Sequence, residues 1–237
     1  MFNLLKHLPK SFFHSPFAHR GYHDCNGIFK EGKGPENSRR SIIHAIQNGL
    51  GVEIDIRFTK DYIPVVIHDD YLKRLCGVDK YLSNTVYREL SLLKLNNNEN
   101  LPTLEEILGI IDGHTPVLIE FKKLNKTQDL INIKKELYSL LSSYSGPLAM
   151  MSFDLKLISH LSKRLPDINI GLVLKVSKDL QEKEVNVDHK GYPIHVIYVK
   201  RKLEHLEEIE PSKTKRNTLK KYLLLILKMK NKLVGIL

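Results

Sequence analysis

Short apolar segments rich in β-branched residues alternate along the chain with segments whose apolar positions recur at the helical period. Segments of the first kind predict strands, at 16–19, 52–59, 64–69, 117–122, 149–153, 170–175 and 194–200. Segments of the second kind predict helices, at 39–48, 104–111, 128–142 and 155–164. Strands that alternate with helices are typical of parallel βαβ units, so the pattern indicates an α/β fold.

One connection is too short for a parallel crossover. Only residues 60–63 separate the second and third predicted strands, whereas a crossover needs about a dozen residues, so these strands are expected to form an antiparallel hairpin. With Asp61 and Tyr62 as the central pair of the turn, His68 lies opposite Asp55. The hairpin therefore predicts a histidine beside a carboxylate.

The predicted strands supply most of a TIM-type (β/α)8 barrel, with the hairpin as an extension over its mouth after strand 2. The C-terminal quarter is divergent, because only 18 residues separate 175 from 194 unless 185–188 is a minimal strand. Residues 203–209 have a helical pattern, and 222–227 fit either a closing strand or a hydrophobic helix. The expected organisation is an N-terminal extension at 1–15, the barrel at 16–210, and a basic segment at 211–237.

The net charge of +10 is unevenly distributed. The 27 residues from Pro211 onward contain eight Lys or Arg residues and no acid, which leaves 29 basic and 27 acidic groups in the other 210 residues. A near-neutral body with a basic tail argues against nucleic acid as a partner. The 42% hydrophobic and 27% charged residues are typical of a soluble globular protein.

The sequence gives little indication of a membrane span, a signal peptide or a disulfide framework. The longest aliphatic run, Leu223–Leu227, is far shorter than the ~18 apolar residues of a membrane span. Lys6 and Lys10 interrupt the apolar opening, which we do not interpret as a signal peptide. Two cysteines, Cys25 and Cys76, exclude a disulfide framework, so we expect a cytoplasmic location.

Three acidic residues are candidate metal ligands. Glu53 and Asp55 are two positions apart in a predicted strand, so both side chains point to the same face. Glu120 ends another apolar run, VLIEF. Carboxylates gathered inside a barrel repel one another, and a hard divalent cation such as Mg²⁺ or Ca²⁺ relieves this repulsion. The alternative is that each acid is a strand-end residue paired with a lysine or arginine.

Two histidines and an arginine complete the candidate chemistry. His19 and Arg20 follow the first predicted strand, and His68 ends the hairpin arm. Two histidines near a metal can share general acid and base duties, and an arginine can hold a phosphate by two parallel hydrogen bonds. In the GPENS segment, Glu36 and Asn37 precede the first predicted helix, where Asn37 or Ser38 could serve as its cap.

The order of several motifs resembles the glycerophosphodiester phosphodiesterase family. These motifs are AHRG (18–21), GPENS (34–38), VEIDIRFTKD (52–61), PVVIHDD (64–70), LPTLEEIL (101–108), IEFK (119–122) and MSFD (151–154). The resemblance covers about residues 16–175. It implies a metal-containing barrel that hydrolyses a glycerophosphodiester, as its small-molecule substrate, to glycerol 3-phosphate and an alcohol.

The resemblance also implies a role for each matching residue. It assigns Glu53, Asp55 and Glu120 to one divalent metal ion, Mg²⁺ or Ca²⁺, His19 and His68 to the acid–base pair, Arg20 and Lys122 to the phosphate, and Glu36 to a supporting position near the metal. Whether water or the substrate's own glycerol hydroxyl attacks is left open.

The resemblance weakens toward the C-terminus. The family has a strand of the WTVN type near its end, whereas this chain has no tryptophan and carries GYPIHVIYVKRK at 191–202. An impaired or non-catalytic barrel that at most binds phosphodiesters is therefore the alternative function. The segment 213–237 could also associate with anionic membrane surfaces, although lysines on a solvated face are the more common case.

Overall fold

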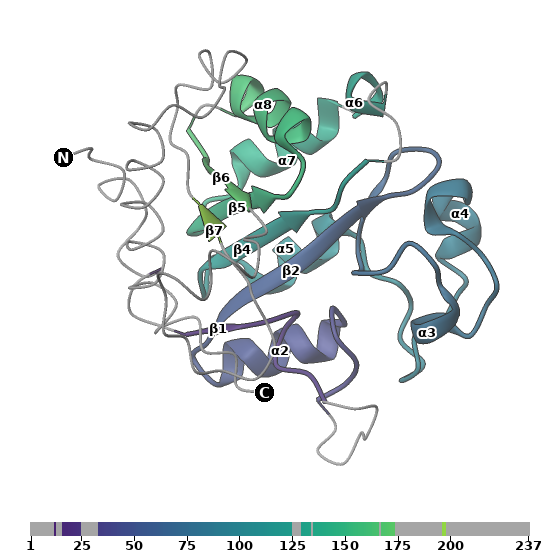
Figure 1. Ribbon diagram of the computed structural model, residues 1–237. Coiled ribbons are helices and arrows are strands. Elements are labelled where there is room, and N and C mark those ends of the chain that lie inside the picture. The colour runs from purple at the N-terminus through teal and green to yellow at the C-terminus, as the bar shows by residue number, and fades with distance from the viewer. Residues whose placement is uncertain are drawn as a thin grey trace, which may run out of the picture.

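The computed structural model of the 237-residue chain describes residues 12, 16–24, 33–124, 129–133, 135–165, 167–173 and 196–197 (Figure 1). Their strands form one sheet in the order β1-β2-β4-β5-β6-β7, with β3 paired to β2. The strands are β1 (Phe17–Ala18), β2 (Gly51–Phe58), β3 (Pro64–Val66), β4 (Val117–Phe121), β5 (Leu148–Ser152), β6 (Asn169–Val173) and β7 (Val196–Ile197).

The first, second, fourth, fifth and sixth strands are parallel, as the alternating pattern predicts. The helices that connect or flank the strands are α2 (Arg39–Gln47), α3 (Lys73–Cys76), the 3₁₀ turn η3 (Leu82–Asn84), α4 (Tyr87–Leu90), α5 (Leu104–Ile111), α6 (Asp129–Asn132), α7 (Lys135–Ser143) and α8 (Leu155–Arg164). The bounds of α5 and α8 are those that the sequence predicts.

Alternation along β2 separates the core from the inner face of the sheet. Its even-numbered residues, Val52 to Phe58, are buried in a core that they share with apolar side chains of α2, α5, α7 and α8. Successive side chains of a strand point to opposite faces. Glu53, Asp55 and Arg57 therefore lie together on the other face, away from these helices.

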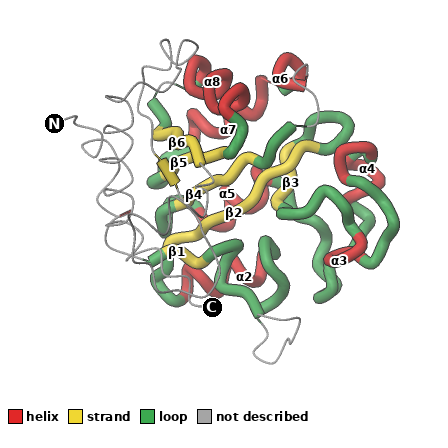
Figure 2. Tube along the Cα trace, in the orientation of Figure 1, coloured by secondary structure: helices red, strands yellow, loops and turns green. Residues whose placement is uncertain are grey.

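The segment between β3 and α5 has a core of its own. Leu72, Leu82, Leu90 and Leu95 are buried there, in a cluster that also includes residues of β3 and the following segment. The helices α3 and α4 of this segment lie beside the end of the β2–β3 hairpin (Figures 1 and 2). We call residues 67–102 the inserted subdomain.

Local hydrogen bonds explain where two helices begin. The Ser38 hydroxyl accepts a hydrogen bond from Ser41 N and caps α2. Thr103 and Glu106 form a reciprocal capping box at the start of α5. Of the two candidate caps predicted for the first helix, Asn37 and Ser38, it is Ser38 that caps α2.

The hairpin is confirmed as antiparallel, but its predicted register is wrong by one residue. Arg57 lies opposite Val65, and Ile67 N donates to Asp55 O, so Ile67 rather than His68 is beside Asp55. The cause is a three-residue turn. Tyr62 N donates to Thr59 O, and Tyr62 has a left-handed φ of 62°, which makes it a third turn residue.

Two other predicted elements differ from the observed ones, and several predicted segments lie outside the described residues. The predicted strand at 194–200 contains β7, which pairs with β6 in the antiparallel sense and so departs from a parallel barrel unit. The predicted helix at 128–142 is two helices, α6 and α7. The segments 185–188, 203–209 and 211–237, and all of 1–15 except residue 12, lie outside the described residues. Among the described helices, none has the length and apolar character needed to span a membrane.

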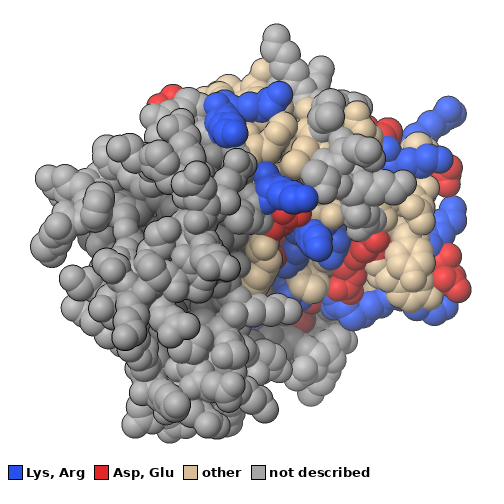
Figure 3. All heavy atoms as spheres, turned by 45° about the horizontal axis from the view of Figure 1, so that its top comes forward, with Lys and Arg blue, Asp and Glu red and all other residues tan. Residues whose placement is uncertain are grey.

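Surface charge of the described part is mixed in sign. On the face drawn in Figure 3, Lys and Arg side chains are interspersed with Asp and Glu side chains.

Candidate active site

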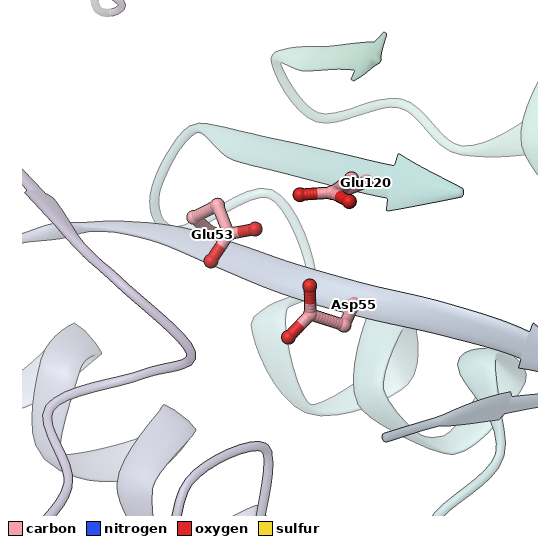
Figure 4. Close-up of side chains that lie close together, drawn as sticks. All are labelled: Glu53, Asp55 and Glu120. Atoms are coloured by element: carbon pink, nitrogen blue, oxygen red, sulfur yellow. The ribbon is translucent and has the colours of Figure 1, made fainter. Parts of the chain in front are cut away.

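Three buried carboxylates form the centre of the site (Figure 4). Glu53 and Asp55 extend from β2, and Glu120 extends from β4, where it lies directly opposite Asp55 in the parallel register. One carboxylate oxygen from each residue lies within 4.8 Å of those of the other two. Alternation along β2 therefore places Glu53 and Asp55 on one face, and the pairing of β4 with β2 brings Glu120 to them.

Burial and mutual repulsion act on these carboxyl groups. Burial, together with the nearby Asp55 and Glu120 charges, raises the pKa of Glu53 well above its usual value. Burial also raises the pKa of Glu120, although Lys122 opposes the shift. For Asp55, burial is outweighed by the charges of Lys122 and Arg20, and its pKa is lowered.

Two cations compensate part of the acidic charge. Lys122 Nζ lies 2.7 Å from Asp55 Oδ1 and 2.6 Å from Glu120 Oε1. Arg20 Nε lies 3.2 Å from Asp55 Oδ2, and Arg20 N donates to Glu53 Oε2 at 2.9 Å. The predicted phosphate-binding residues therefore lie against the predicted metal ligands.

Arg20 is held by a turn that packs on α2. Its φ is 58°, and it is followed by Gly21 with a φ of 80°. A Cβ atom at Gly21 would lie 2.5 Å from Ser41 Oγ, so only glycine fits this approach of the turn to the helix. Left-handed backbone at a residue other than glycine costs free energy and often marks a functional site.

Asn37 is a site residue that the sequence pattern did not reveal. Its side-chain Nδ2 donates to Asp55 Oδ2 at 2.9 Å, and its Oδ1 accepts from Asp55 N at 3.2 Å. Its own backbone N donates to Arg20 O at 2.8 Å, with a φ of 57°. The position before a helix suggested a capping role, whereas the side chain fixes the orientation of Asp55.

His19 lies at the edge of the carboxylate cluster. Its Nε2 is 4.0 Å from Glu53 Oε2, and its side chain is 43% exposed. Burial of the ring, followed by the charge of Arg20, lowers its pKa from 6.5 to about 4. At neutral pH the imidazole is therefore uncharged and available to accept a proton.

His68 enters the site from the inserted subdomain. Its Nδ1 is 2.7 Å from Asp69 Oδ1, and its backbone carbonyl accepts from Arg57 Nε at 2.5 Å. Its charge contributes to the lowered pKa of Asp55. Although His68 is not opposite Asp55 in the hairpin, the two groups act on one another across the site.

Glu36 links Arg20, beside the carboxylate cluster, to Arg74 of the inserted subdomain. Its Oε1 accepts from Arg20 Nη1 at 3.0 Å and from Arg74 Nη2 at 2.7 Å, while Oε2 accepts from Arg74 Nη1 at 3.0 Å. Burial tends to raise the pKa of Glu36, but the hydrogen bonds and charges of the two arginines outweigh it and lower the pKa. Arg57, Asp69 and Arg74 were not among the predicted site residues, and the 38 positions between Arg74 and Glu36 show why the sequence did not display their contact.

Comparison with known proteins agrees with this geometry. The sequence model of the glycerophosphoryl diester phosphodiesterase family matches residues 19–220. The chain belongs to this family. A glycerophosphodiester phosphodiesterase from Bacillus altitudinis is 25% identical over 167 residues, which cover 66% of this chain and 65% of that protein. Glycerophosphodiester phosphodiesterase 1 of Homo sapiens is 36% identical over 111 residues, which cover 42% of this chain and 31% of that protein. The chain thus spans less than two thirds of the length of these relatives.

Solved structures of the family share the fold. A phosphodiesterase from Oleispira antarctica, solved in complex with the product sn-glycerol-3-phosphate, has a TM-score of 0.60 at 27% identity and matches 76% of this chain and 72% of its own. A glycerophosphodiester phosphodiesterase from Thermotoga maritima has a TM-score of 0.52 at 26% identity and matches 68% of this chain and 63% of its own. The predicted TIM-type α/β fold is confirmed.

The acidic cluster of this family member fits a divalent cation. Glu53 Oε1 is buried and has no hydrogen-bond donor within the part of the chain that the structure describes. Three carboxylates supply only oxygen ligands, which suit Mg²⁺ or Ca²⁺ better than a soft metal. A bound cation would coordinate the buried oxygen of Glu53 that has no donor, and it would stabilise the ionised form that the raised pKa shows to be disfavoured.

Proposed function

We propose that this protein hydrolyses glycerophosphodiesters to glycerol 3-phosphate and an alcohol, with the help of one divalent metal ion. The observation that carries the proposal is the buried cluster of Glu53, Asp55 and Glu120 with Arg20 and Lys122 against it. Buried carboxylates alone would be electrostatically unfavourable, and basic side chains alone would bind an anion without a metal ion. Together they suit a phosphodiester whose oxygens face both a metal and basic side chains.

In this proposal Glu53, Asp55 and Glu120 hold the metal, Mg²⁺ or Ca²⁺. When bound there, the ion polarises phosphate oxygens and favours ionisation of an attacking hydroxyl. Asn37 Nδ2 donates to the Asp55 carboxylate and Asn37 Oδ1 accepts from Asp55 N, so the carboxylate is already oriented before an ion binds.

Arg20 and Lys122 orient the phosphate. Both are presented beside Asp55, with Lys122 at 2.7 Å and Arg20 at 3.2 Å from its oxygens. A guanidinium can donate two parallel hydrogen bonds to phosphate oxygens, and an ammonium adds a compact positive charge. Glu36 supports this arrangement because it accepts a hydrogen bond from Arg20 Nη1.

His19 and His68 share the proton transfers. The lowered pKa of His19 keeps its ring neutral at neutral pH, which suits Nε2 to accept a proton from the attacking hydroxyl. Asp69 holds the Nδ1–H of His68, so that the imidazolium form of the ring presents Nε2–H, which gives its proton to the departing alkoxide and leaves the ring neutral. If the attacking group is the substrate's own glycerol hydroxyl, a cyclic phosphate is the first product.

The test is release of glycerol 3-phosphate from glycerophosphocholine and glycerophosphoethanolamine in the presence of Mg²⁺, Ca²⁺ or chelator. His19→Ala should abolish metal-dependent release, whereas His114→Ala, at an exposed position outside the site, should retain it. Phosphorus NMR of the products separates direct hydrolysis from a cyclic-phosphate route. A folded sample that binds a phosphodiester without turnover would favour the alternative, a non-catalytic barrel.

A cytoplasmic location fits the cysteine content. Cys76 is a free thiol, and burial raises its pKa to about 11, which makes it a poor nucleophile for disulfide exchange. The protein should therefore retain its activity in a reducing buffer. Binding of the basic segment 211–237 to anionic membrane surfaces remains a separate hypothesis, which a vesicle co-sedimentation experiment would test.

A further inference from the structure

Arg74 connects the inserted subdomain to the mouth of the barrel. It lies on α3, and its guanidinium uses all three of its nitrogens. Nη1 and Nη2 donate to the two oxygens of Glu36 at 3.0 and 2.7 Å, and Nε donates to Asp69 Oδ2 at 2.6 Å. One side chain therefore binds two carboxylates that are 33 positions apart in the sequence.

Each of these carboxylates contacts a different candidate site residue. Asp69 uses its other oxygen, Oδ1, for the imidazole Nδ1 of His68 at 2.7 Å. Glu36 uses Oε1 for Arg20 Nη1 at 3.0 Å. A continuous chain of hydrogen bonds thus runs from His68 through Asp69, Arg74 and Glu36 to Arg20.

We propose that Arg74 is a positioning residue, which fixes the tautomer and orientation of His68 through Asp69 and the orientation of Arg20 through Glu36. The proposal deepens the proposed function and rests on it for the consequence in catalysis. An ionised carboxylate only accepts hydrogen bonds, so Asp69 keeps the proton on Nδ1 of His68. Without Arg74, Asp69 could rotate and the proton could occupy either ring nitrogen.

The geometry requires an arginine. Its planar fork matches both oxygens of Glu36 while Nε faces Asp69, whereas the single ammonium of lysine cannot satisfy this arrangement. The Arg74 side chain is 49% exposed. Ion pairs at exposed positions contribute little to stability. Loss of Arg74 should therefore affect the site far more than the fold.

The experiment compares the full-length wild type with Arg74→Ala, Arg74→Lys and a matched control, Arg88→Ala. Arg88 is an exposed arginine on α4 of the same subdomain. We expect kcat for glycerophosphodiester hydrolysis to fall about 10- to 100-fold in both Arg74 variants, with a much smaller change in KM. Added guanidinium should restore part of the activity of Arg74→Ala and leave Arg88→Ala unchanged.

A second readout does not depend on turnover. In ¹⁵N NMR spectra recorded at a pH where the His68 ring carries a single proton, and with its signals identified from a His68→Gln sample, the wild type should carry that proton on Nδ1. Arg74→Ala should show a mixture of tautomers, while Arg88→Ala should match the wild type. Melting temperatures of the Arg74 variants should stay within about 4 °C of wild type.

The two readouts separate the possible failures. A wild type without phosphodiesterase activity would refute the proposed function, and the NMR spectra would still decide whether Arg74 positions His68. An Arg74→Ala variant with wild-type kcat, no response to guanidinium and unchanged His68 signals would overturn the inference. Should Arg74→Ala fail to fold, the same comparison with Arg74→Lys decides it.

Discussion

Asp55 and Glu120 lie directly opposite each other on the parallel strands β2 and β4, and the Lys122 ammonium lies within 2.7 Å of both carboxylates. The pair places two negative charges at one level of the barrel interior, with Glu53 close by. Lys122 balances part of this charge. The remaining acid, Glu53, keeps a buried oxygen without a donor among the described residues.

Glu53 should therefore destabilise the metal-free protein. Burial and the charges of Asp55 and Glu120 raise its pKa, so its ionised form is disfavoured in the folded state. In chelator, Glu53→Gln should melt at a higher temperature than wild type, by about 2–4 °C for each kcal/mol gained at this chain length. Mg²⁺ or Ca²⁺ should raise the melting temperature of the wild type but not that of Glu53→Gln.

The control is Glu105→Gln, which removes a charge from an exposed position of α5. This variant should respond to metal as the wild type does. An equal metal-induced shift in Glu53→Gln and wild type would show that Glu53 is not a ligand.

His19 should make the folded state sensitive to acid. Its pKa is lowered from 6.5 to about 4 by burial and by Arg20. An unfolded chain binds a proton at this residue below pH 6.5, whereas the folded chain does so only near pH 4, so the free energy of unfolding falls as the pH drops through this window. The His19 contribution is fully present above pH 6.5.

Urea unfolding of wild type and His19→Gln at pH 7 and pH 4, in chelator, tests this sign. The variant should lose less stability than wild type over the interval, and His114→Gln should behave as the wild type does. Equal losses in His19→Gln and wild type would contradict a lowered pKa of His19 in the folded state.

Asn37 should matter both for its side chain and for its backbone. Asn37→Gly keeps the left-handed conformation but removes two buried hydrogen bonds to Asp55, one to its carboxylate and one from its backbone N, at a cost of about 1–3 kcal/mol. Asn37→Ala adds the strain of an alanine at a φ of 57°, about 1 kcal/mol more. Denaturant titrations that rank the two variants in the reverse order would refute this account.

Gly21 should tolerate no side chain. An alanine Cβ would lie 2.5 Å from Ser41 Oγ and 2.9 Å from the Ser41 carbonyl carbon, so we expect a loss of at least about 2 kcal/mol and displacement of His19 and Arg20. Gly49→Ala is the matched control because Gly49 also has a positive φ, 66°, but its Cβ would meet nothing within 4 Å. Similar unfolding midpoints for the two variants would show that the turn does not depend on this close approach.

Local patterns predicted much of the fold and the acidic centre. Alternation in β2 predicted the common face of Glu53 and Asp55, and the helical period of residues 104–111 predicted the bounds of α5. These features depend on neighbours within a few positions, which a sequence displays directly.

The wrong hairpin register and the missed site residues depend on backbone conformations and long-range contacts that a sequence does not display. Tyr62 adopts a left-handed conformation without being glycine, and this extra turn residue shifted the register of the hairpin. Asn37 precedes a helix, where a cap is the usual function, and its contact with Asp55 spans 18 positions. Arg74 lies in an inserted subdomain whose docking on the barrel is determined by tertiary packing.

The most direct test is release of glycerol 3-phosphate from glycerophosphocholine by wild type and Glu120→Gln, each with Mg²⁺, with Ca²⁺ and with chelator. The proposed function predicts metal-dependent release by wild type, no release in chelator, and a severe loss in Glu120→Gln under all conditions. Release that persists in chelator, or that is equal in the two proteins, would contradict a catalytic metal held by Glu53, Asp55 and Glu120.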